Sequence, residues 1–391
     1  QANLAQAGQC SSQPMQLHRA SRFGAQCLGV IVSICFSSAR AWGANIHDAS
    51  LPGASVHQHL PGEWPLDSCP PVESVQCADV SGKRKAAVYL VGIKHRAILN
   101  STMQHVLRRL VDDGFAVHVY VSLIFDASGT GNWFASTRSI GREDPSIEHL
   151  SRRELQLHVH DLVQATGACL VCAEVPQRPQ TVPHIPVNAG QLSQFPPHRT
   201  RTGKRLLNMW LRRERMWNAT LQRERALGER YEFLMWVRDD ALWVADMARP
   251  SVLLRTPRAA STLWTRRCGA WGGLNDKVAM FGRAAAPTLL TLYSGFMHGG
   301  LPARTKNSEA YILEAAARGR VVLERTGFEV QPSVEAMVYD GRRGPALCVM
   351  EKYWCGGDRG RYGLAAEFCE DVARSRSLPR FGERRQLRGG R

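Results

Sequence analysis

The sequence predicts an α/β fold in which a mostly parallel central sheet is flanked by helices. Apolar runs of strand length alternate along the chain with stretches of helical periodicity, which is the pattern of repeated βαβ units. The strand-length runs are continuously apolar, as expected for strands that are buried on both faces of a parallel sheet. With 391 residues, of which 44% are hydrophobic, the chain is long enough to bury a large core.

The predicted sheet begins with a βαβ unit. Residues 86–92 (AAVYLVG) form the first apolar run, residues 98–110 have helical spacing, and residues 115–123 (FAVHVYVSL) form the second run. A helix between two buried strands implies a right-handed crossover that joins a parallel pair. A third apolar run at 168–175 leads into a proline-rich segment, 176–197, which has no helix or strand pattern and is predicted to be a long loop.

The second half of the predicted domain starts with a long helix at 203–227. Its leucine and tryptophan residues recur at three- to four-residue steps, and its arginines occupy the other face. We expect this basic face to be exposed to solvent, and contact with a phosphate is the alternative. The remaining predicted elements are a strand at 233–237, a strand at 277–281 followed by a helix through Tyr293, a helix at 308–318 and a strand at 321–324.

The N-terminal region has the pattern of a secretory signal peptide. A short apolar run at 24–36 follows basic residues and precedes Ala39 and Ala41, the small residues that a signal peptidase requires. The run is shorter than the roughly 20 residues that span a bilayer, so we expect cleavage before Trp42, and membrane association only if the signal stays uncleaved. Translation from Met15 would place the basic residues correctly. A buried apolar helix in a cytosolic protein is the alternative.

Composition divides the chain into five predicted segments. They are a leader and signal peptide at 1–41, a flexible linker at 42–83, the α/β domain at 84–340, a cysteine-containing appendix at 341–373 and a disordered Arg-rich tail at 374–391. Eight of the 11 cysteines follow the predicted cleavage point, an even number that is compatible with disulfides in an oxidising lumen. Asn100 and Asn218 begin glycosylation sequons. These features favour the ER or Golgi lumen, or secretion.

The formal net charge of +16 is concentrated in two stretches. Residues 199–230 hold ten Lys or Arg against three Glu, and residues 374–391 hold seven Arg against one Glu, which together account for +13. No zinc-finger spacing, homeodomain helix or RNA-binding aromatic motif accompanies this charge, so we do not expect a nucleic-acid partner. A polyanion binder that uses the long helix and the tail is kept as an alternative class.

The most informative motif is YEFLMWVRDD, where an apolar strand ends in Asp239 and Asp240. Ligands of open α/β sheets bind outside the carboxyl ends of the strands. Adjacent carboxylates at such an end are hard oxygen ligands that can hold Mn²⁺ or Mg²⁺ against a diphosphate. The alternative is an ordinary turn in which Arg238 forms an ion pair with a neighbouring Asp.

A second motif, CGAWGGLNDKVAMFG, lies just before the 277–281 strand. Gly272 and Gly273, after Trp271, allow a close backbone approach because they lack a Cβ. Asn275 and Asp276 are candidates for binding sugar hydroxyls, since sugar sites combine fixed polar groups with an aromatic platform. A glycine-rich turn in which Asp276 makes a local hydrogen bond is the alternative.

Two further loops carry candidate residues. Lys94 and Arg96 follow the first strand, where a phosphate can be gripped, and we favour Arg96. Glu309 lies in the first turn of a predicted helix, and capping by Asn307 or Ser308 explains this segment equally well. Other signals are weak. The CLVC run at 169–172 lies inside an apolar strand, which indicates core or disulfide-bonded cysteines, and no dinucleotide, Walker or GxSxG motif is present.

These motifs resemble a family of eukaryotic glycosyltransferase-like proteins from algae, protists and fungi. Family members carry a strand followed by a basic loop, then Y-[DE]-x-[VL]-x-x-x-R-x-D, W-G-G-[ILV]-N-D-[KR] and a [NS]-S-E helix start. The matching segments here are VYLVGIKHR, YEFLMWVRDD, WGGLNDK and KNSEAYI, in the same order, within about residues 86–332.

The resemblance implies a GT-A-like nucleotide-diphospho-sugar transferase. By this likeness Asp239 and Asp240 hold the metal, Asp276 contacts the sugar, and Glu309 is the base. Lys94, Arg96, Arg238, Asn275 and the Trp271–Gly273 segment are expected to bind the donor. The implied partners are a nucleotide sugar and a glycan or protein acceptor. The chain has RDD where D-x-D is usual, and an inactive carbohydrate-binding relative is the second class that stays open.

Overall fold

The computed structural model describes Cys77 and residues 82–125, 146–179, 201–298, 307–341, 344–349 and 367–368. The predicted signal peptide, most of the predicted linker, much of the proline-rich segment and the Arg-rich tail lie outside the described residues. In the described part of the chain, no helix is both long and apolar enough to cross a membrane.

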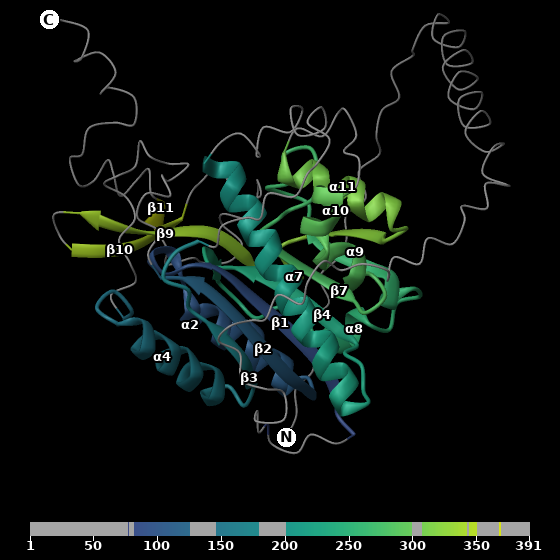
Figure 1. Cartoon of the computed structure of the whole chain (residues 1–391), viewed down its shortest axis with the longest axis horizontal. Helices are drawn as coiled ribbons and strands as arrows, with labels where there is room; N and C mark the ends of the chain where they lie inside the picture. Colours follow the sequence, from purple (N-terminus) through teal and green to yellow (C-terminus); the bar gives the residue numbers. More distant parts are fainter. Residues whose placement is uncertain are drawn as a thin grey trace, which may run out of the picture. The chain divides into compact units, whose positions relative to one another are not determined.

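A seven-stranded sheet forms the centre of the fold (Figure 1). In spatial order its strands are β3 (Cys169–Glu174), β2 (Phe115–Ile124), β1 (Arg84–Ile93), β4 (Phe233–Arg238), β7 (Val278–Gly282), β6 (Thr262–Arg266) and β8 (Val322–Thr326). The first four strands and the β6–β8 pair are parallel, and β7 is antiparallel to both of its neighbours. The predicted α/β class with a mostly parallel sheet is confirmed.

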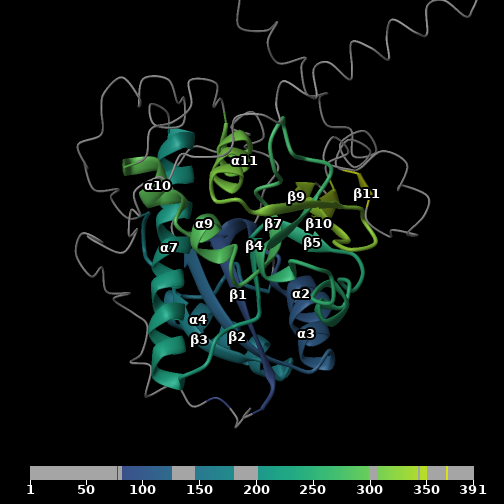
Figure 2. The ribbon, with the colours of Figure 1, turned by 90° about the vertical axis from the view of Figure 1, so that its right-hand side faces the viewer.

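The sheet separates two apolar layers because alternate β1 side chains point to opposite faces. Tyr89 lies in the apolar core that includes the long helix, whereas Val88 lies in the apolar core on the other face of the sheet. The first layer holds α7 (Arg201–Leu227), α9 (Ala286–Leu290), α10 (Leu292–His298) and α11 (Ser308–Arg318); the second holds α2 (Leu99–Thr102), α3 (Arg108–Asp112) and α4 (Arg152–Ala165). Figure 2 shows α7 on one side of the sheet and α2 with α3 on the other.

The helix predicted at 98–110 is continuous but not uniform. Between α2 and α3, residues Met103–Leu107 (η3) make π-helical hydrogen bonds. The helix predicted through Tyr293 is divided at Thr291 into α9 and α10. Two short elements, α8 (Pro250–Leu253) and the 3-10 helix η5 (Ala259–Ser261), were not predicted.

A second sheet has four strands, which come from distant parts of the chain. Its order is β11 (Glu367–Phe368), β10 (Gly344–Val349), β9 (Ser333–Gly341) and β5 (Ala241–Trp243). β5 begins directly after Asp240 and pairs antiparallel with β9. This sheet therefore joins residues on both sides of position 340, where the sequence predicted the end of the domain.

The prediction that the arginine face of α7 is exposed to solvent is wrong. Four of its arginines are at most 5% exposed, namely Arg212, Arg213, Arg215 and Arg223. The helix packs against β1 and also against α9 and α10. These four arginine side chains are therefore enclosed, and they reach polar groups inside the fold. Arg215, for example, lies 3.4 Å from the carboxylate of Glu174, at the end of β3.

Beneath α7 lies a buried polar chain. Nδ1 of His118 is 2.6 Å from the hydroxyl of Tyr231, which is 3.2 Å from the hydroxyl of Tyr120. Burial, reinforced by the positive charges of Arg223 and Lys85, lowers the pKa of His118 to about 3. His118 is therefore neutral in the folded protein at physiological pH.

Four cysteines in the described part of the chain are disulfide-bonded. Cys77 pairs with Cys169 across 92 residues, and Cys172 and Cys268 are in disulfides as well. The CLVC run is therefore neither a zinc site nor a dithiol, in agreement with the prediction of disulfide-bonded cysteines.

Candidate functional site

The candidate site lies where the carboxyl ends of β1 and β4 meet. β2 and β3 lie on one side of β1, and β4, β7, β6 and β8 lie on the other, so the strand order reverses between β1 and β4. Such a switch point is where open α/β sheets bind their ligands. The 3-10 helix η2 (Lys94–Arg96) follows β1 here, and Asp239 and Asp240 follow β4.

Arg96 and Asp239 connect the two strand ends. The Nη2 and Nε atoms of Arg96 donate to the two carboxylate oxygens of Asp239, at 2.8 and 3.1 Å. The N–H of Ile93 donates to the same carboxylate at 2.8 Å. A Cβ on Gly92 would lie 2.0 Å from Cγ of Asp239, so glycine at this position provides the space for the buried carboxylate.

Arg238 joins the other two carboxylates. Its Nε and Nη2 atoms each donate to one oxygen of Asp240 at 2.6 Å, and Nη1 lies 3.4 Å from both oxygens of Asp276. Arg96 Nη1 is also 3.4 Å from Asp240. Burial alone would raise the pKa of Asp240, but Arg238 and Arg96 outweigh it and hold this pKa below its usual range. The ion pair between Arg238 and a neighbouring Asp, one of the two predicted alternatives, is present.

The antiparallel direction of β7 brings Asp276 to this edge. Val278 at the start of β7 pairs with Val237 near the end of β4, and the N–H of Arg238 donates to the carbonyl of Lys277 at 2.8 Å. Lys277 Nζ lies 3.6 Å from the Asp276 carboxylate. Burial raises the pKa of Asp276, and the positive charges of Lys277 and Arg238 more than offset this, so the net shift is downward.

Glu309 lies beside Asp276 at the start of α11. The loop before β7 packs directly on this helix end: the N–H of Leu274 donates to the carbonyl of Glu309 at 3.0 Å, and a Cβ on Gly273 would lie 2.0 Å from the same carbonyl. Burial, followed by the negative charge of Asp276, raises the pKa of Glu309. The predicted cap is also present, since the side chain of Asn307 accepts from the N–H of Ala310 at 2.8 Å.

Trp271 is the exposed aromatic residue of the same loop. It is 56% exposed and has a φ of 41°, and Gly272 follows with a φ of 84°. The side-chain amide of Asn307 donates to the Trp271 carbonyl at 2.9 Å, which ties the loop to the first turn of α11. The Trp271–Gly273 segment therefore lies next to the start of the helix that carries Glu309.

Two predicted donor-binding residues are engaged elsewhere. The ammonium group of Lys94 donates to the carbonyls of Glu148 and Leu150 at 2.9 and 3.0 Å. The side chain of Asn275 closes a local turn: its Nδ2 donates to the carbonyl of Cys268 at 3.0 Å, and its Oδ1 accepts from the N–H of Lys277 at 2.9 Å. Both side chains thus hold backbone segments that border the site.

Two residues at this edge, Arg212 and Arg213 of α7, were not among the predicted site residues. Arg212 donates to the hydroxyl of Ser122 and to the carbonyl of Gly92, at 2.7 and 3.0 Å. Arg213 donates to the backbone carbonyl of Asp276 at 3.1 Å. The sequence feature that could have indicated them is the cluster of arginines in the middle of a helix with a strong apolar pattern. This cluster was expected to lie on a face exposed to solvent.

The donor set of the cluster does not fit a divalent cation. Both oxygens of Asp239 and both oxygens of Asp240 already accept N–H groups, and guanidinium groups neutralise their charge. Mn²⁺ and Mg²⁺ are held by carboxylates that keep their negative charge, and displacing these N–H groups would leave buried guanidinium groups unpaired. The metal role predicted for this pair therefore has no support in the geometry. Among the described residues, ligand atoms close enough to share an ion belong to Cys77, His118 and Cys169, and the two cysteines are consumed by their disulfide.

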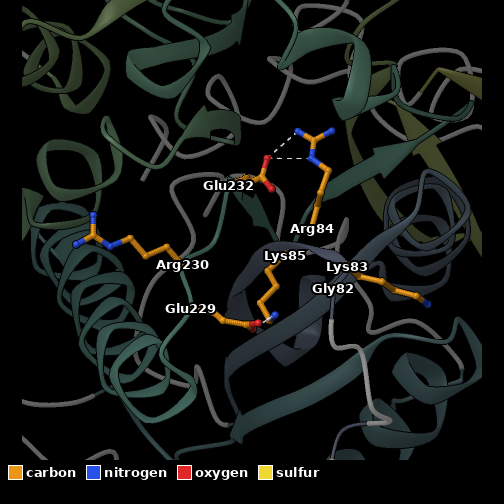
Figure 3. Close-up of a pocket in the computed structure, with 7 residues that line it drawn as sticks. All are labelled: Gly82, Lys83, Arg84, Lys85, Glu229, Arg230 and Glu232. Atoms are coloured by element: carbon orange, nitrogen blue, oxygen red, sulfur yellow. Dashed lines mark hydrogen bonds and ion pairs between the residues drawn. The ribbon is translucent and has the colours of Figure 1, made fainter.

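A surface pocket lies at the opposite, amino-terminal ends of β1 and β4 (Figure 3). Its volume is about 310 Å³, and it is lined by Gly82, Lys83, Arg84, Lys85, Glu229, Arg230 and Glu232. Arg84 forms an ion pair with Glu232 at 2.9 Å, and Lys85 forms one with Glu229. These two ion pairs give no specific indication of a ligand.

Comparison with known proteins finds similarity in solved structures. No protein-family model and no curated protein matches the sequence. GlyE of Streptococcus pneumoniae is 10% identical, with a TM-score of 0.33, and the similar region covers 62% of this chain but only 46% of GlyE. The galactosyltransferase LgtC, solved with donor and acceptor sugar analogues, is 11% identical over 62% of this chain and 73% of its own, with a TM-score of 0.29.

A third structure is glucosyl-3-phosphoglycerate synthase from Mycobacterium tuberculosis, in complex with Mn²⁺, UDP-glucose and phosphoglyceric acid. It is 12% identical over 69% of this chain and 76% of its own, with a TM-score of 0.24. The structural neighbours are thus glycosyltransferases, at low sequence identity.

Proposed function

We propose that this chain is a glycosyltransferase that moves a sugar from a nucleotide-sugar donor to a hydroxyl group of an acceptor. The observation that carries the proposal is the convergence of Arg96, Asp239, Asp240, Asp276 and Glu309 from four separate segments at the switch point of the sheet. Buried charges concentrated at a strand-end edge are typical of functional sites.

Glu309 has the properties of a general base. A carboxylate is an efficient proton acceptor near neutral pH when its pKa is raised, and burial together with Asp276 raises the pKa of Glu309. In the proposed reaction the acceptor oxygen forms a bond to the anomeric carbon of the donor sugar. The bond from that carbon to the diphosphate oxygen breaks, the diphosphate leaves with the electron pair, and the acceptor proton passes to Glu309.

Trp271 supplies the surface on which a sugar ring can lie. Its ring is largely exposed, and its backbone is fixed to the first turn of the helix that carries Glu309. Sugar recognition combines an aromatic platform with a few fixed polar groups, which here would be Asp276 and Glu309.

The proposal extends to a secretory compartment, with a glycan or a protein as the acceptor. It is supported by the disulfides at Cys77, Cys169, Cys172 and Cys268, because disulfides form and persist in an oxidising lumen. Asn100, the first residue of one sequon, is exposed at the start of α2 and is accessible to glycosylation.

Turnover of a nucleotide-sugar panel tests the activity. The protein is produced in a secretory host, and release of the nucleoside diphosphate is measured for wild type, Glu309→Gln and Glu314→Gln. Glu314 lies on the same helix in an exposed ion pair with Arg318, so its variant controls for the loss of a charge. We expect turnover with one donor, a kcat lowered about 100-fold or more in Glu309→Gln with little change in KM, and no effect in Glu314→Gln.

A catalytically inactive carbohydrate-binding protein is the second candidate. It is favoured by the exposed Trp271 ring beside carboxylates that are already neutralised by arginines. Binding of glycans on an array, without turnover of any donor, would support this candidate over the transferase.

A further inference from the structure

Arg212 and Arg213 lie on opposite sides of the switch point. Arg212 contacts Ser122 near the end of β2 and Gly92 near the end of β1. Arg213 stacks on the ring of Trp236 of β4, with its guanidinium carbon 4.4 Å from the ring centroid, and reaches the backbone of Asp276 before β7. In the order β2, β1, β4, β7 the two guanidinium groups therefore flank the junction between β1 and β4.

Both guanidinium groups carry buried nitrogen atoms that lack an acceptor. In the described part of the chain these atoms are Nη2 of Arg212 and Nε and Nη1 of Arg213. Buried polar groups in folded proteins are almost always hydrogen-bonded, and a charged donor without a partner is especially unfavourable. Three such atoms on two consecutive residues at a switch point indicate a place for acceptor atoms that the protein itself does not supply.

The balance of charge at this edge also favours an anion. The contacts join six cationic side chains, Arg96, Arg212, Arg213, Arg215, Arg238 and Lys277, to four carboxylates, Glu174, Asp239, Asp240 and Asp276. Six positive against four negative charges leave an excess of two, or of one if Glu309 is counted as ionised. A diphosphate group carries negative charge of about this size and would balance the excess.

The pKa values of the surrounding groups show that burial of these cations is unfavourable. Burial lowers the pKa of Arg213 to about 9 and that of Arg212 to about 10, because neighbouring carboxylates compensate only in part. Burial, followed by the charges of Arg96 and Arg205, lowers the pKa of His95 to about 4. An anion beside Arg212 and Arg213 would relieve this unfavourable environment.

We propose that the guanidinium groups of Arg212 and Arg213 bind the diphosphate of the donor in place of a divalent cation. This inference rests on the proposed transferase function. Asp239 and Asp240 then serve to position Arg96 and Arg238, which explains why all their oxygens accept guanidinium or backbone N–H groups. When the bond to the anomeric carbon breaks, the leaving diphosphate oxygen gains negative charge, and the arginine N–H groups stabilise it.

Binding of phosphate probes to the full chain tests the proposal. Titration calorimetry measures the Kd of UDP, GDP and inorganic pyrophosphate, in EDTA and in Mn²⁺, for wild type, Arg213→Gln, Arg213→Lys and Arg225→Gln. Arg225 lies on the exposed face of the same helix, so Arg225→Gln is the matched control. We expect wild type to bind a nucleoside diphosphate equally well in EDTA and in Mn²⁺.

The variants separate phosphate binding from a structural role. We expect the Kd in EDTA to rise about 10- to 100-fold in Arg213→Gln, because a charged hydrogen bond is lost. The Kd should rise less in Arg213→Lys and should stay unchanged in Arg225→Gln. Binding that is abolished by EDTA in wild type would overturn the arginine proposal and leave the transferase function intact. This wild-type comparison decides the proposal even if Arg213→Gln fails to fold. Absence of binding to every probe, with or without Mn²⁺, would overturn both proposals.

Discussion

Substitution of Gly273 by alanine tests whether the glycine-rich loop positions Glu309. The new Cβ would lie 2.0 Å from the carbonyl carbon and oxygen of Glu309, whereas ordinary van der Waals contact begins at 3.4 Å. The loop and the start of α11 must therefore move apart by about 1.4 Å, the difference between these two distances. A shift of roughly 1 Å in a catalytic group lowers the rate about 100-fold, and overpacking of this kind costs about 1–3 kcal/mol of stability.

The assay is kcat with the donor identified in the nucleotide-sugar panel, together with the melting temperature. Gly228→Ala is the control, because its Cβ meets nothing within 4 Å and its φ of 66° adds only the backbone penalty of about 1 kcal/mol. We expect kcat to fall about 100-fold in Gly273→Ala and to stay unchanged in Gly228→Ala. Equal kcat values in the two variants would refute the claim that this contact positions Glu309.

Three further predictions concern pH, the disulfide and the aromatic platform. The pKa of His118 is lowered from 6.5 to about 3, so the stability that depends on its neutral form is present above pH 6.5 and is lost as the pH falls toward 3. Denaturant unfolding should show that the free energy of unfolding decreases by about 2 kcal/mol between pH 6.5 and 5. This decrease should be absent in His118→Gln. The double variant Cys77→Ser with Cys169→Ser removes a disulfide that links residues 92 positions apart. Calorimetry should show that the free energy of unfolding falls by about 4 kcal/mol, and an unchanged melting temperature would contradict this prediction. Trp271→Ala should leave the free energy of unfolding within about 0.5 kcal/mol of wild type, since the ring is exposed, and should raise the KM for the sugar substrate roughly 5- to 10-fold; an unaltered KM would exclude the platform role.

The elements that the sequence predicted well are those with strong local signals. β1, β2 and β4 are continuously apolar and buried, so their positions follow from composition alone. α11 has its predicted bounds because Asn307 caps its start and Gly319 ends it. Short strands were missed: β5 has three residues, and β6, TLWTR, includes two threonines and an arginine.

Side-chain partners that are distant in the sequence could not be predicted. Lys94 was expected to face a phosphate, yet the carbonyls that it binds lie 54 and 56 residues further along the chain. Arg212 and Arg213 looked like part of a solvated face because no local pattern shows that α7 passes over the carboxyl ends of the strands. Residue types made Arg96, Asp239, Asp240 and Asp276 candidate site residues, whereas the ion pairs among them depend on the tertiary fold.

The reversed direction of β7 has a consequence for how the protein folds. Asp276 reaches Arg238 only after β7 has paired with β4, and Glu309 is fixed only after α11 has docked on the loop before β7. The site thus depends on contacts between segments that are far apart in the chain, and such contacts form slowly. During refolding, helix content should therefore recover first, and ligand binding should return only when the last part of the sheet has assembled.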